Sequence, residues 1–156
     1  MKKIHFCILS IVLLSIIAIL IVLIINKKNS NLIKLEESDY KVEKLITIDE
    51  KKLEEKQTNK DSFILYIHVP GLCTSTIPFD PMVNDFIKNN KITIYSLPFS
   101  LVKNTNLKDT IKYSPSLAIY YNGKLIDYLD ANSKEDYEYY SSYDGLTKWI
   151  TNYVNV

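Results

Sequence analysis

The chain has 156 residues, with 19 basic and 18 acidic side chains and a formal net charge of +1, and Lys provides every basic side chain. This length fits one domain of roughly 100 to 150 residues plus an anchor, and it excludes two globular cores. The balanced charge and the lack of Arg exclude a basic field or a bidentate phosphate clamp, so nucleic acid is not an expected partner.

The first element is an apolar run at residues 4–25, which is 22 positions without a Lys, Asp or Glu. At 1.5 Å per residue this length crosses a hydrocarbon core of roughly 30 Å. It is longer than the apolar core of a secretory signal, and no small-residue cleavage site follows it before Lys27. We therefore expect a membrane anchor at 1–25, with a cleaved signal as the alternative, and a juxtamembrane linker at 26–43.

The orientation of the anchor follows from two rules that conflict. Only Lys2 and Lys3 precede the apolar run, whereas five lysines follow it between residues 27 and 44. The positive-inside rule would place the domain in the cytoplasm, but large domains translocate with little regard to charge. A short tail with two lysines is typical of a signal-anchor. We expect a single-pass protein of the cell membrane whose soluble domain is extracytoplasmic, and a cytoplasmic domain is the alternative.

The folded domain is predicted over residues 44–156, where strand and helix patterns alternate. Thr47 followed three places later by Glu50 is a capping-box pattern that opens a helix, and Asp80 is a good cap for the next one. In chain order we predict a strand at 44–48, a helix at 50–57, a strand at 63–69, a helix at 81–90, a strand at 92–99, a polar segment at 100–113, a hairpin of 115–121 and 124–129, and a helix at 143–154.

This order of elements predicts an α/β fold. Strands that are separated by helices pair in parallel through crossovers, while the hairpin around Asn122 and Gly123 adds antiparallel strands. The long apolar strand at 63–69 has the composition of one that is buried on both faces. A mixed sheet with helices on both faces follows.

Three motifs carry a resemblance to a known family. The buried strand runs directly into the sequence PGLCTST, in which the cysteine is Cys73. Pro81 lies eight residues after Cys73, and Ser114 and Pro115 precede the hairpin that contains LAIYYNGK. In this order and spacing, residues 44–155 resemble the thioredoxin-like superfamily.

The resemblance implies a thioredoxin-like three-layer fold preceded by the transmembrane helix. It implies an active-site loop at Cys73 and a cis Ser114–Pro115 bond, with Ser114 as a backbone anchor for an extended client segment. The alternative for Pro115 is an ordinary trans proline that starts an edge strand. A protein or peptide client is therefore the expected partner besides the membrane, and no cofactor is expected.

The motif departs from the family pattern at the second cysteine, since the family has Cys-x-x-Cys and this chain has Thr76 in the last position. Thr76 cannot form a disulfide, so an intrinsic dithiol cycle is not available. At a helix N-terminus Cys73 would have a lowered pKa and act as a nucleophile, with the Thr76 hydroxyl donating to the thiolate. The alternative is a cysteine that packs as a small apolar residue in a loop. Leu72 and Ile67 also replace family residues.

Two functions are compatible with these residues. The first is a membrane-tethered module that binds extended protein segments through Ser114 and Pro115. The second is an enzyme, a monothiol thiol-disulfide oxidoreductase or isomerase that uses Cys73 and an external thiol, as an accessory to peptide or bacteriocin export or independently of it. We prefer the binding module and keep the enzyme as the alternative. A third, structural interpretation keeps the fold with no peptide site.

The remaining polar positions predict no metal site. His68 fits a half-buried histidine of the strand, with a base for the thiol as the alternative. Because His5 lies in the predicted anchor, the two histidines and the one cysteine outside the anchor do not supply a metal cluster. Residues 127–144 hold six acids and five tyrosines, but Lys134 and Glu135 break a calcium-loop pattern. We interpret this segment as a solvated excursion, with a protein-contact surface as the alternative.

Overall fold

The computed structural model describes residues 32–71 and 79–156. The predicted anchor at 1–25 lies outside these ranges, and so do the predicted site residues Cys73 and Thr76. Within the described ranges, no helix combines the length and the apolar composition that a membrane span requires.

A five-stranded mixed sheet forms the centre of the described unit, as predicted. Its strand order is β1-β3-β2-β4-β5, in which β1, β3 and β2 are parallel, β4 is antiparallel to β2, and β5 is antiparallel to β4. The strands are β1 (Lys44–Thr47), β2 (Phe63–His68), β3 (Thr93–Pro98), β4 (Ser116–Tyr121) and β5 (Lys124–Tyr128).

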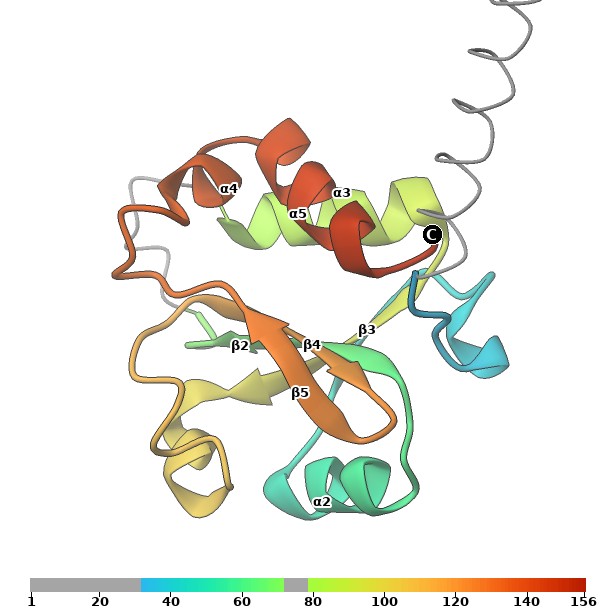
Figure 1. Ribbon diagram of the computed structural model, residues 1–156, viewed down its shortest axis with the longest axis vertical. Helices are drawn as coiled ribbons and strands as arrows, with labels where there is room; N and C mark the ends of the chain where they lie inside the picture. Colours follow the sequence, from blue (N-terminus) through green and yellow to red (C-terminus); the bar gives the residue numbers. More distant parts are fainter. Residues whose placement is uncertain (1–31, 72–78) are drawn as a thin grey trace, which may run out of the picture. The chain divides into compact units, whose positions relative to one another are not determined.

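Helices cover both faces of this sheet, so the unit has three layers (Figure 1). The long α3 (Phe79–Asn90) and α5 (Tyr143–Tyr153) pack on one face, and α2 (Glu50–Thr58) packs on the other. Side chains of β2 alternate between the two cores, since Tyr66 packs with α3 and α5 while Ile67 packs with α2. Three short helices complete the unit, namely η1 (Glu37–Asp39), η2 (Phe99–Asn104) and α4 (Tyr137–Ser141).

The predicted capping box of α2 is wrong. Thr47 is the last residue of β1, and its hydroxyl shares a hydrogen bond of 3.0 Å with the Ser96 hydroxyl on β3. The cap is Asp49, whose side chain accepts a hydrogen bond of 2.8 Å from the backbone N–H of Lys52. Sheet pairing holds Thr47 away from the helix, and Asp is at least as good an N-cap as Thr.

The compact unit begins at Ile33 and therefore includes part of the predicted linker at 26–43. Ile33 and Leu35 are buried in the core on the α3 and α5 face. The backbone N–H of Ile33 donates to the carbonyl of Tyr153 at 2.7 Å, which ties this segment to the end of α5. The sequence shows only isolated apolar positions here, because their partners lie at the other end of the chain.

Candidate functional site

The predicted binding residues lie at one edge of the sheet, where β2 ends and β4 begins. Ile67 on β2 is paired with Ser116 on β4, so the last residues of β2 and the first of β4 are neighbours. Ser114 and Pro115 directly precede β4, and the bond between them is cis, as the resemblance implied. The segment that contains Cys73 and Thr76 connects β2 to α3 and lies outside the described residues.

A hydrogen-bonded tyrosine links β2 to the start of α3 at this edge. The Tyr66 hydroxyl donates to the carboxylate of Asp80. Because α3 already includes Phe79, Asp80 lies in its first turn and is not the predicted cap. Burial, and next the bond to Asp80, raise the pKa of the Tyr66 phenol. The phenol therefore remains a protonated donor at physiological pH.

His68 stacks on Tyr66 at the end of β2, with ring centroids 4.6 Å apart and ring planes at 16°. The ring is half-buried, in agreement with the predicted strand histidine, and its Nδ1 has no hydrogen-bond partner among residues 32–71 and 79–156. Its alternative role as a base for the thiol of Cys73 stays a hypothesis, because that thiol lies outside the described residues.

Tyr140 was not identified from the sequence. Its ring is only 6% exposed, and its hydroxyl lies 2.8 Å from the carbonyl oxygen of Pro115 and 2.9 Å from that of Leu129. The ring packs on Phe79 with centroids 4.6 Å apart. Most of residues 127–144 are exposed or half-buried, as expected of a solvated excursion, but Leu129 and Tyr140 are buried. The available signal was the density of tyrosines, which exceeds what a solvated loop needs.

Three exposed apolar side chains belong to the segments that meet at this edge, and we call them the Pro115 rim: Val69, Tyr113 and Tyr137. They are 37%, 49% and 62% exposed. Val69 follows β2, Tyr113 precedes the Ser114–Pro115 turn, and Tyr137 opens the helix that carries Tyr140. The pairing of β2 with β4 and the contact of Tyr140 with Pro115 bring these three segments to one edge.

Other exposed large apolar side chains are dispersed over the described unit. They lie on β1, on the hairpin of β4 and β5, and at the C-terminus, and they are Ile46, Tyr121, Ile126 and Val156. None of them adjoins the turn at Pro115. The Pro115 rim is thus the group whose segments meet at the predicted binding residues.

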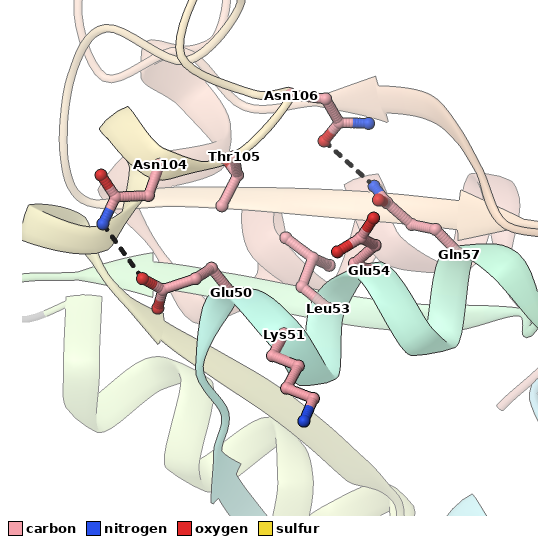
Figure 2. Close-up of a pocket in the computed structure, with 8 residues that line it drawn as sticks. All are labelled: Glu50, Lys51, Leu53, Glu54, Gln57, Asn104, Thr105 and Asn106. Carbon is pink, nitrogen blue, oxygen red and sulfur yellow. Dashed lines mark hydrogen bonds between the residues drawn. The ribbon is translucent and has the colours of Figure 1, made fainter.

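A cavity of about 340 Å³ lies on the sheet face that α2 covers, between α2 and the end of η2 (Figure 2). Asn104 Nδ2 donates to Glu50 Oε1 at 3.0 Å, and Gln57 Nε2 donates to Asn106 Oδ1 at 3.2 Å. Of the predicted site residues that the structure describes, neither Ser114 nor Pro115 lines it. Its lining consists of Glu50, Lys51, Leu53, Glu54, Gln57, Asn104, Thr105 and Asn106.

Metal ligation was not predicted for this chain. In the part of the chain that the structure describes, no group of three His, Cys, Asp or Glu side chains is arranged to hold a metal ion. The edge at Pro115 instead has an apolar rim and a short stretch of backbone before β4. The buried Tyr140 phenol contacts this backbone at Pro115.

No protein-family model and no curated protein matches the sequence. Solved structures do match. A mutant thioredoxin from Halobacterium salinarum is 10% identical, with a TM-score of 0.54 over 73% of this chain and 94% of its own. An oxidised thioredoxin from Plasmodium falciparum is 14% identical, with a TM-score of 0.51 over 72% and 100%. A thioredoxin pre-protein from Schistosoma mansoni is 12% identical, with a TM-score of 0.51 over 71% and 99%. The chain has a thioredoxin-like fold, as predicted.

Proposed function

We propose that the chain is a membrane-tethered thioredoxin-like module that binds extended protein segments at the edge where β4 begins. The observation that carries this proposal is the Pro115 rim, in which Val69, Tyr113 and Tyr137 are exposed on the three segments that meet at the predicted backbone anchor. Tyrosine is enriched at protein interfaces because its large ring loses little conformational entropy on binding.

The backbone beside the rim suits an extended partner. The ladder between β2 and β4 begins at Ser116, so residues 113–115 lie just beyond it. An extended segment that lies along these residues would bond to their backbone, while the rim would contact its side chains. Such a mode selects unfolded or extended chains over folded ones.

Cys73 determines whether binding is accompanied by chemistry. It belongs to the connection between β2 and α3 and lies outside the described residues. The alternative function, monothiol exchange, requires its thiolate to attack a client disulfide and an external thiol to release the enzyme. Binding by the module does not require that thiol, so the two functions separate when Cys73 is replaced.

The binding proposal is tested by removing one ring of the rim. In the full chain, Tyr113→Ser is expected to weaken binding of reduced, carbamidomethylated ribonuclease A about tenfold, the effect of losing one well-placed aromatic contact. This probe is unfolded and has no free thiol. Fluorescence anisotropy of the labelled probe measures the affinity, and native ribonuclease A should not bind.

Tyr121→Ser is the matched control, because Tyr121 is 46% exposed at the opposite end of β4. Its affinity should equal that of the unmodified chain. Equal losses from the two substitutions, or no binding by the unmodified chain, would contradict the proposal.

The tether completes the proposed function. The apolar run at residues 4–25 supports a single-pass anchor in the cell membrane. The short tail with Lys2 and Lys3 before it supports a signal-anchor whose domain is extracytoplasmic. Protease added to intact cells is expected to digest the domain while cytoplasmic markers survive. Protection of the domain until the cells are lysed would reverse the orientation.

A further inference from the structure

A hydrogen bond from α4 holds the backbone at the start of the binding edge. The Tyr140 hydroxyl lies 2.8 Å from the carbonyl oxygen of Pro115 and 2.9 Å from that of Leu129, which directly follows β5. The Ser116 hydroxyl donates to the same Leu129 carbonyl at 2.5 Å. One phenol therefore joins the turn before β4 to the segment after β5.

The Tyr140 phenol is suited to remain a donor. Burial raises its pKa, and the neighbouring carboxylates of Asp136 and Asp130 raise it further. The single proton that it shares between the carbonyls of Pro115 and Leu129 is therefore retained throughout the physiological pH range. An aliphatic side chain at this position would leave the Pro115 carbonyl without its side-chain partner.

A chain of aromatic rings connects Tyr140 to the other side of the edge. Tyr140 packs on Phe79 at 4.6 Å, Phe79 packs on Tyr66 at 5.9 Å, and Tyr66 stacks on His68 at 4.6 Å. These rings come from α4, α3 and β2. The turn at Pro115, the first residue of α3 and the end of β2 are therefore packed as one body.

We propose that Tyr140 is a positioning residue for client binding, whose hydroxyl fixes the Pro115 carbonyl and with it the backbone of residues 113–115 that an extended client meets. This inference rests on the proposed binding function and assigns a role within it to the acidic, tyrosine-rich segment. Fixing the backbone in advance lowers the ordering cost of association, because less conformational freedom is lost when the client arrives.

Tyr140→Phe tests the inference, because it removes the hydroxyl and keeps the ring on Phe79. In the full chain, purified in mild detergent, it is expected to weaken binding of reduced, carbamidomethylated ribonuclease A about fivefold, the size of one lost hydrogen bond. The carbonyl ¹³C shift of Pro115 should change in the same variant. Urea unfolding verifies that the variants are folded under the binding conditions.

Tyr40→Phe is the control for a purely structural effect. The Tyr40 hydroxyl donates to the Asn155 carbonyl at 2.8 Å and accepts from the Leu35 N–H at 3.1 Å, so this substitution removes at least as many bonds elsewhere. The affinity of Tyr40→Phe for the ribonuclease probe and the carbonyl ¹³C shift of Pro115 in this variant should not change. Equal affinity of Tyr140→Phe and the unmodified chain, or equal losses in both variants, would overturn the inference alone. No binding by the unmodified chain would overturn the proposed function and the inference together.

Discussion

The Thr76→Cys variant is expected to reduce insulin disulfides about tenfold faster than the unmodified chain, because a second thiol releases the mixed disulfide from within the same loop. With Thr76 in place, any adduct at Cys73 must wait for an external thiol. The gain should stay below the rate of a dithiol thioredoxin, since Leu72 and Ile67 also depart from the family pattern. Turbidity of precipitating insulin, with dithiothreitol as the electron source, measures the rate.

Two variants control this result. Thr76→Ser keeps the hydroxyl and should leave the rate unchanged, while Cys73→Ser combined with Thr76→Cys should remove the gain. Robust turnover by the unmodified chain that Cys73→Ser abolishes would favour the monothiol enzyme over the binding module.

The Gly123→Ala variant is expected to lower the free energy of unfolding by about 3 kcal/mol, through backbone strain combined with a steric clash. Gly123 has a φ of +75° in the hairpin turn, and an added Cβ would lie 2.1 Å from the carbonyl oxygen of Gln57. Its N–H donates to the Asp61 carbonyl at 2.8 Å, so the turn cannot move away without losing that bond. Urea unfolding followed by circular dichroism measures the change.

Gly71→Ala separates strain from the clash. Gly71 has a φ of +77°, and none of the described residues places an atom within 4 Å of an added Cβ. Gly71→Ala should lower the free energy of unfolding by only about 1 kcal/mol, the cost of a left-handed backbone conformation for a residue with a Cβ. Equal losses at Gly71 and Gly123 would contradict the close approach of the hairpin to α2.

The strands and long helices could be predicted because neighbouring residues carry the pattern of each of these elements. The run at 63–69 became β2 (Phe63–His68), and Asn122 with Gly123 formed the turn between β4 and β5. Both residues have a positive φ, which such a turn requires and which Asn and Gly tolerate best. The mixed sheet follows from the order of these elements.

The errors arose where distant partners decide the structure. Ile33 is an isolated apolar residue in the sequence and gains its place only by pairing with Val154. Helix α4 (Tyr137–Ser141) is too short for helical periodicity to be visible, so Tyr140 looked like part of a polar loop. Asp49 displaced Thr47 as the cap because β1 continues through Thr47.

The sequence indicated which segments of the chain form the candidate site, but it did not indicate that Tyr140 belongs to it. Ser114 and Pro115 lie beside the end of β2, because Ile67 on β2 is paired with Ser116. The binding roles of Ser114 and Pro115 stay predictions. Those of Cys73 and Thr76 also stay predictions, because both lie outside the described residues.

Photo-crosslinking from the rim tests the central claim most directly. The photoreactive residue p-benzoylphenylalanine would be introduced into the full chain at position 113, or at position 121 as the matched site on β4, and irradiated with reduced, carbamidomethylated ribonuclease A. The binding proposal predicts an adduct from position 113 and little from position 121, with excess unlabelled probe suppressing the adduct. Equal adducts from both positions, or an adduct from position 121 alone, would contradict client binding at the edge where β4 begins.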